Sequence, residues 1–298
     1  MTDLVQLLVK GAALGGVYAL VALGFVVVFK ATGVINFAHG SLMLLGSYLA
    51  YTASISWGLP FPVAVLVAVA GAVVSALAME RVVLRRMLGR PVVAVLLVTI
   101  GLAIVVDQLV TAVWGFRPHP VGDPWGARSV RVGGVVLAQV DLATLAITGV
   151  MVAGLSVFFR TTRMGLALRA AASDLEAAVA QGISPALISR WAWGLAAGVA
   201  AVAGALLASG TGAASPELGE QALRAFPAVV LGGFASLGGA VIGGLVIGVV
   251  EVLTAGYAPG HAPWLGTNAH LVAPYVVMLV LLAVRPDGLL GSREARRL

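Results

Sequence analysis

Two polar side chains stand at the head of an apolar stretch near the N-terminus, in the run Asn36-Phe37-Ala38-His39-Gly40. Polar groups next to long apolar segments are costly in lipid, which makes them functional candidates. Asn36 and His39 fit three functional roles: capping the next helix, lining a cavity or touching a solute. A purely structural interpretation has Asn36 as an N-cap and His39 facing headgroup water.

Two acidic residues fall inside other apolar stretches. Asp107 lies about two helical turns before Trp114-Gly115, and Glu251 lies within a later segment. Each is expensive in contact with lipid, so we expect it to face other helices or a wet cavity. A proton-coupled transporter would use such acids as relays. The structural alternative places both close to interfacial water.

Motifs of enzymes that bind ATP or zinc are absent from the sequence. It has no G-x-x-x-x-G-K-[ST] phosphate loop and no H-E-x-x-H, and its four histidines are scattered at positions 39, 119, 261 and 270. Ser41 lies near His39 but lacks the context of a nucleophile elbow. We therefore predict that the chain is not an enzyme and binds no metal or cofactor.

The polar segment 160–185 carries helix start and stop signals. Ser173 and Glu176 have capping-box spacing. Gly182 stands where a helix would end in a left-handed cap, and Pro185 suits the first position of the next helix. The pattern predicts a short, separately capped helix over residues 174–181.

One face of this predicted helix is apolar. Leu175 and Val179 are four residues apart and share a face, with Ala178 and Gly182 beside them. Such a small apolar surface suits a groove on a partner protein. The alternative is a surface helix that lies in the lipid headgroup region.

Composition requires lipid as the solvent. Hydrophobic residues make up 60% of the 298 residues and charged residues only 10%, against about 25% in soluble domains. The mean hydropathy is +1.06. The 38 glycines favour closely packed helices, and repeated alternation typical of a β-barrel is missing. We predict an all-α, polytopic membrane helical bundle that forms a single transmembrane domain over residues 1–298.

Nine apolar stretches predict eight or nine transmembrane segments, some short or broken. They lie near residues 4–29, 38–57, 61–83, 92–115, 141–159, 186–209, 226–237, 240–257 and 271–284. The seventh is too short to cross as a straight helix. Between the fourth and fifth, residues 116–140 form an external loop whose alternating valines predict a small hairpin.

The basic residues give the orientation. With nine crossings, thirteen of the eighteen fall on one side, including Arg293, Arg296 and Arg297 in the tail. The positive-inside rule then predicts an external N-terminus and a cytoplasmic C-terminus. The isoelectric point near 10.3 is thus explained by membrane topology, and no nucleic-acid partner is predicted.

Glycines recur at small-xxx-small spacing, which predicts close helix packing. The pairs are Gly239/Gly243, Gly244/Gly248, Gly11/Gly15 and Gly194/Gly198.

Three blocks together resemble the branched-chain amino acid (LivH-type) permease family of ABC importers: Tyr18–Gly40, Gly165–Gly182 and Gly232–Gly248. Glu176-Ala177-Ala178 followed by Gly182 matches the E-A-A-x-x-x-G pattern of importer permeases, where this loop is the coupling helix. The resemblance implies ATPase-coupling residues at Arg169, Asp174, Leu175, Glu176, Ala177, Ala178, Val179 and Gly182. It also implies a substrate pathway at Tyr18, Asn36, Phe37, His39, Gly40, Gly232, Gly233 and Gly239.

The resemblance further implies a multi-pass location in the cytoplasmic membrane and several partners. These are two cytoplasmic ABC ATPase subunits, which use ATP and Mg²⁺, a homologous or identical second permease, and an extracytoplasmic solute-binding protein. The expected solute is a branched-chain amino acid, or a related amide or urea. The rival hypothesis is an autonomous facilitator or proton-coupled carrier that uses Asp107 and Glu251. A structural membrane scaffold is a third class.

Overall fold

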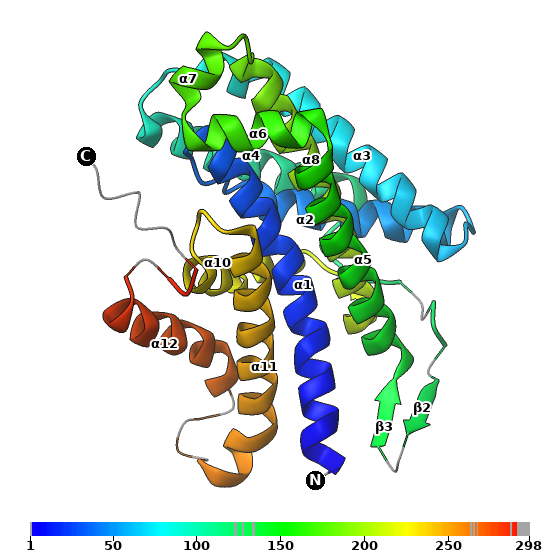
Figure 1. Cartoon of the computed structure of the whole chain (residues 1–298). Helices are drawn as coiled ribbons and strands as arrows, with labels where there is room; N and C mark the ends of the chain where they lie inside the picture. Colours follow the sequence, from blue (N-terminus) through cyan, green and yellow to red (C-terminus); the bar gives the residue numbers. More distant parts are fainter. Residues whose placement is uncertain are drawn as a thin grey trace. The chain divides into compact units, whose positions relative to one another are not determined.

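The computed structural model describes residues 2–121, 124–126, 128–132, 135–262, 264, 266, 268–286 and 288–290, and these are predominantly helical (Figure 1). The long helices are α1 (Thr2–Thr32), α3 (Phe61–Val82), α4 (Val92–Trp114), α5 (Gln139–Thr161), α8 (Pro185–Thr211) and α11 (Leu237–His261). Within the described residues these six are long and apolar enough to cross a membrane. They confirm the helical membrane class predicted from composition.

Shorter helices complete the described chain. They are α2 (His39–Tyr51) with the π-helix η1 (Thr52–Ser56), the 3₁₀-helix η2 (Leu84–Met87), α6 (Arg163–Ser173), α7 (Leu175–Ala180), α9 (Leu218–Arg224), α10 (Phe226–Gly232) and α12 (Ala269–Val284). Each of the nine predicted apolar stretches thus contains a helix. The basic tail residues Arg293, Arg296 and Arg297 lie outside the described residues.

Four short strands form two antiparallel pairs. β2 (Ser129–Val132) pairs with β3 (Val135–Ala138), which confirms the hairpin predicted from the alternating valines. β1 (His119–Pro120) pairs with β4 (Ala213–Ala214).

The chain divides into two compact units. The described residues of Met1–Leu23, Asp123–Val150 and Leu223–Leu298 form unit 1, and those of Gly24–Gly122 and Met151–Ala222 form unit 2. In unit 2, α2 packs against α3, α4 and α8, and α3 also packs against α8. In unit 1, α11 packs against α10 and α12.

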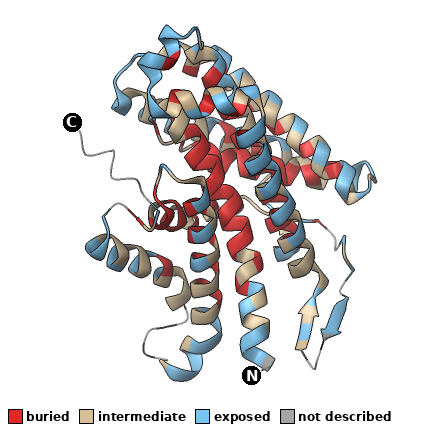
Figure 2. Ribbon diagram, viewed as in Figure 1, coloured by how far each residue is buried: buried red, intermediate tan, exposed pale blue. Residues whose placement is uncertain are grey.

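Burial differs sharply among the long helices (Figure 2). Buried side chains run along most of α8, from Ile188 to Ser209. In α3 they form a single stripe of alanines four residues apart, with Glu80 at its end: Ala64, Ala68, Ala72 and Ala76. A narrow stripe of this kind is expected of a helix that contacts the protein on one side only.

Helix starts follow local sequence. Prolines occupy the first turn of α3, α8 and α10, where the missing N–H removes no helical hydrogen bond. Ser236 caps α11 by accepting a hydrogen bond from the Gly239 amide at 2.9 Å. Gly233, with φ of +88°, ends α10 three residues before this cap.

Candidate functional site

The polar segment between α5 and α8 contains the short helix that the sequence predicts, with one correction at its start. Asp174 caps α7: its Oδ1 accepts from the Ala177 amide at 2.9 Å. The predicted cap by Ser173 is wrong, because Ser173 ends α6 and its Oγ donates back to the Arg169 carbonyl at 3.1 Å. The extended backbone of Asp174, φ −155° and ψ 105°, separates the two helices. The carboxylate therefore satisfies a free amide and also faces the positive end of the α7 dipole.

The other end of α7 closes as predicted. Gly182 has φ of +86°, and its amide donates to the Val179 carbonyl at 2.9 Å. The Ile183 amide donates to the Ala178 carbonyl at 3.0 Å, which completes a Schellman motif. Three residues further on, Pro185 opens α8. A helix of six residues cannot rely on propensity alone, so these caps hold it in place.

The apolar face of α7 is open to solvent. Leu175 is 44% exposed and Val179 is 45% exposed, whereas Ala178 is only 5% exposed. Asp174, Glu176 and Ala177 are also exposed. Ala178 is thus the buried residue of the helix, and two large apolar side chains point outward, with the acidic residues Asp174 and Glu176 at the first turn.

The run Asn36–Gly40 forms a turn before α2 rather than a side-chain cap on it. Asn36 Oδ1 accepts from the Ala38 amide at 3.0 Å, but Ala38 is the N-cap residue of α2 and makes no side-chain cap. The interpretation of Asn36 as the N-cap of this helix is therefore wrong. The Phe37 amide donates to Thr99 Oγ1 at 3.3 Å, which ties the turn to α4.

His39 is fully buried, with 0% exposure, so the interpretation that it faces headgroup water is wrong. Its ring lies 4.8 Å from that of Phe25, centroid to centroid. A Cβ at Gly24 would collide with the imidazole, so glycine is required for the ring to lie against α1. Gly40 is equally close-packed: a Cβ there would lie 2.6 Å from the Gly219 carbonyl oxygen.

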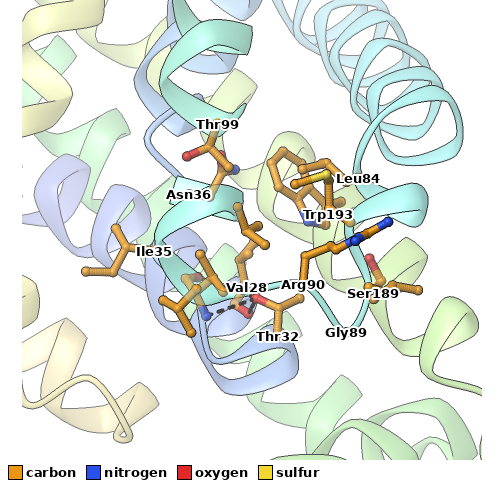
Figure 3. Close-up of a pocket in the computed structure, with 15 residues that line it drawn as sticks. Val28, Thr32, Ile35, Asn36, Leu84, Gly89, Arg90, Thr99, Ser189 and Trp193 are labelled. Atoms are coloured by element: carbon orange, nitrogen blue, oxygen red, sulfur yellow. Dashed lines mark hydrogen bonds between the residues drawn. The ribbon is translucent and has the colours of Figure 1, made fainter. Parts of the chain in front are cut away.

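A cavity of about 250 Å³ opens beside Asn36 in unit 2 (Figure 3). Its walls come from the end of α1 and the turn after it, from η2 and the connection to α4, and from the first turns of α4 and α8. Asn36 is 1% exposed and its Nδ2 has no hydrogen-bond partner among the described residues. The polar wall includes Thr32, Thr99, Ser189 and Arg90.

In unit 1 the structure brings together two residues that the sequence left apart. Tyr18 on α1 donates from its hydroxyl to Glu251 Oε2 on α11 at 2.8 Å. The side chains are 3% and 6% exposed, so Glu251 faces the protein interior, as its cost in lipid predicts. In unit 2, Asp107 is half-buried on α4 and lies near Gly219: a Cβ built there would be 3.8 Å from Asp107 Oδ1.

The three glycines predicted for a pathway after α9 occupy a tight contact between α10 and α11. A Cβ at Gly232 would collide with the backbone of Gly239, and a Cβ at Gly239 would collide with Gly232. Gly233 makes the turn between the helices. Their absence of side chains therefore serves close packing within unit 1.

One buried charge escaped the sequence analysis. Glu80, near the end of α3, is 0% exposed, and its Oε2 pairs with the Arg85 guanidinium at 3.4 Å. The available signal was an acid at the end of an apolar stretch, five residues before an arginine. No group of three His, Asp or Glu side chains in the described chain is placed to hold a metal ion.

Comparison with known proteins matches residues 7–283 to the family described as branched-chain amino acid transport system / permease component. The chain belongs to this family. It is 32% identical to the high-affinity branched-chain amino acid transport system permease protein LivH of Salmonella typhimurium, over 98% of this chain and 97% of that protein. BraD of Pseudomonas aeruginosa, described in the same words, is also 32% identical over the same shares.

A more distant relative is the probable branched-chain amino acid transport permease protein LivH of Methanocaldococcus jannaschii, 27% identical over 96% of this chain and 92% of its own. No solved structure matches the chain. Family membership and the six apolar helices together make this permease a multi-pass membrane protein.

Proposed function

We propose that this permease is the membrane-spanning subunit of an ABC importer in the cytoplasmic membrane and moves branched-chain amino acids, or a related amide or urea. Full-length similarity to LivH and BraD, whose names state branched-chain amino acid transport, supports the substrate class. ATP and Mg²⁺ are used by partner subunits, since the sequence has no phosphate-binding loop.

The proposed assembly holds two cytoplasmic ABC ATPases, a second permease, identical or homologous, and an extracytoplasmic solute-binding protein. Residues 1–298 serve as one transmembrane permease domain in it. The distribution of Lys and Arg supports an external N-terminus and a cytoplasmic C-terminus.

Six described helices are long and apolar enough to cross a membrane, so nine crossings require three of the shorter helices to cross as well. α2 and η1 run without interruption from His39 to Ser56, about 27 Å at 1.5 Å per residue, and α12 spans about 24 Å. α10 has only seven residues, so the seventh crossing, predicted over residues 226–237, would be a tilted or broken element. The lengths of the α2–η1 segment and of α12 approach the roughly 30 Å of a hydrocarbon core.

The single observation that carries the coupling mechanism is the exposed face of α7. Leu175 and Val179 project from a helix that is capped at both ends and followed directly by α8. In the proposal, this face sits in a groove of the ATPase, and closure of the ATPases moves α7 and α8 together as a rigid body. Arg169 on α6, together with Asp174 and Glu176, would add polar contacts at the rim.

The test is ATP-driven uptake of leucine by the complex reconstituted in liposomes. Val179→Glu places a charge on the exposed face, and Glu176→Arg reverses the rim charge. Each is expected to lower uptake and ATPase co-purification at least about tenfold, since loss of a central contact costs roughly 2 kcal/mol or more. Gly182→Trp should act alike, because a left-handed φ disfavours any side chain.

Ala180→Glu is the matched control, because it adds the same charge to an exposed position of the same helix outside the Leu175–Val179 face. It should retain uptake. Full uptake by Glu176→Arg and Gly182→Trp would reject the coupling role. Uptake without ATPases, abolished by Asp107→Asn or Glu251→Gln, would instead establish the autonomous carrier.

A further inference from the structure

The cavity in unit 2 is small and mostly apolar. Its volume of about 250 Å³ lies just below the range of roughly 300–1,000 Å³ that holds drug-sized ligands, so it has room for a ligand of few non-hydrogen atoms. Val28, Leu84, Val95 and Trp193 give it walls that suit an aliphatic side chain. None of its fifteen lining residues is Asp or Glu.

One polar group on the cavity wall, the Asn36 amide, has a buried donor without an acceptor in the described part of the chain. Asn36 uses Oδ1 to hold the Ala38 amide, which leaves Nδ2 as a buried donor without a partner among the described residues. Leaving such a donor unpaired costs about 1–3 kcal/mol. A ligand oxygen in the cavity would remove this cost.

Arg90 supplies the charge. It lies in the short connection between η2 and α4, where Gly89 has φ of +78° and the Arg90 amide donates to the Met87 carbonyl at 3.0 Å. This turn places Arg90 on the cavity wall near Ser189 and Trp193 (Figure 3). An arginine fork is the side chain best matched to a carboxylate.

We infer that this cavity binds the carboxylate of a small aliphatic acid, with Arg90 and Asn36 as donors and the apolar walls around the hydrocarbon part. The inference rests on the proposed function: under the proposed topology the cavity opens at the cytoplasmic end, so it is a release-side subsite for the imported amino acid. Because the wall lacks an acidic residue, recognition depends on the carboxylate and not on the amino group.

Position also links this subsite to the coupling helix. Ser189 and Trp193 lie in the first turns of α8, which begins at Pro185 just after the Schellman motif of α7. A movement of α7 is therefore transmitted to one wall of the cavity, which would weaken the subsite during each ATPase cycle.

The experiment measures binding by calorimetry to the purified full chain in nanodiscs of neutral phosphatidylcholine. The probes are L-leucine, 4-methylpentanoate, which lacks the amino group, and L-leucinamide, which lacks the carboxylate. The first two should bind within about threefold of each other, and L-leucinamide about tenfold or more weakly, as expected for loss of a charged hydrogen bond. Equal binding of L-leucinamide and L-leucine, or no binding of either acid, would overturn the inference.

Substitutions of Arg90 and Asn36 test whether these residues donate to the bound carboxylate. Arg90→Gln should weaken L-leucine about tenfold or more. Asn36→Asp keeps the oxygen for the Ala38 amide but removes the donor, and should act in the same direction. Arg86→Gln is the matched control, because Arg86 lies in η2, four residues before Arg90, and does not line the cavity. Equal losses in Arg86→Gln and Arg90→Gln would mean a general charge effect and refute the site.

Two further outcomes are decisive. Loss of 4-methylpentanoate binding when phosphatidylglycerol replaces a third of the lipid would mean that the cavity holds an anionic lipid headgroup, which refutes an amino-acid subsite. Normal binding and uptake by Arg90→Gln, together with loss of uptake by Glu176→Arg, would refute the subsite while the proposed importer stands.

Discussion

In unit 1 the contact between α1 and α11 is made by glycines whose missing side chains admit the backbone of the other helix. A Cβ on Gly11 would lie 2.8 Å from the Cα of Val249, and one on Gly15 would lie 2.7 Å from the Cα of Leu245. In unit 2 the contact between α8 and α3 carries the same small-xxx-small spacing. There, Cβ atoms on Gly194 and Gly198 would meet only valine and leucine side chains at 3.6–3.9 Å.

Small-xxx-small spacing therefore permits two helices to approach closely but does not force them to do so. Helices in lipid gain stability from packing and not from a hydrophobic driving force. Backbone contact therefore requires small residues on both helices. On α11, Gly248 lies against Gly15 and Gly11 of α1, and Gly244 lies against the backbone of Ala19. α3 offers Val69 and Val73 to the glycines of α8, which keeps those helices further apart.

The largest effect is expected from Gly248→Ala. The new methyl group would collide with the Gly15 backbone, which forces α1 and α11 apart. Overpacking of this kind costs about 3 kcal/mol. The free energy of unfolding, measured in bicelles, should fall accordingly. Gly238→Ala on the same helix should not lower it, because nothing lies within 4 Å of its Cβ position.

A second prediction separates two faces of one helix. Gly204 of α8 faces the Met43 carbonyl of α2, where a Cβ would collide. Gly204→Ala should therefore destabilise the protein by about 2 kcal/mol. If its thermal unfolding midpoint matched that of Gly198→Ala, the contrast between the two faces of α8 would be refuted.

A smaller effect is expected from the polar link across the α1–α11 contact. Tyr18→Phe removes the donor to Glu251 and should cost about 1 kcal/mol, in the range of hydrogen bonds measured between membrane helices. A double-mutant cycle with Glu251→Gln gives the pair energy. A coupling near zero would show that the pair contributes nothing to the contact.

The smallest effect, and of opposite sign, is expected for Gly198→Ala. Its methyl group would make ordinary contacts with Val69 and Val73 at 3.6 and 3.7 Å. Alanine is favoured over glycine within a helix, so a gain of about 0.5 kcal/mol is expected. Marked loss of stability would show that the α3–α8 contact is as tight as the α1–α11 contact.

Several features were predictable because their causes are local. The end of α7 at Gly182 and the start of α8 at Pro185 depend on the backbone preferences of single residues. The start of α7 was predicted one residue early, because Ser173 and Asp174 are both good N-cap residues. Only the fold shows that Ser173 still belongs to α6 and that Asp174 lies between the two helices. The full burial of His39 depends on Gly24, fifteen residues away, and no local signal reports it.

The membrane class, the helical segments and the permease family were predictable from the sequence, because apolar composition, the length of apolar stretches and helix caps do not depend on how the helices pack. Only the tertiary structure shows which glycines lie against the backbone of a neighbouring helix and which lie against its side chains. It also decided that Tyr18 reaches Glu251, that Glu80 lies buried beside Arg85, and that Asn36 and Arg90 share one cavity. These are contacts between residues distant in the chain or in separate turns, and their geometry is set by how helices pack, which spacing alone does not specify.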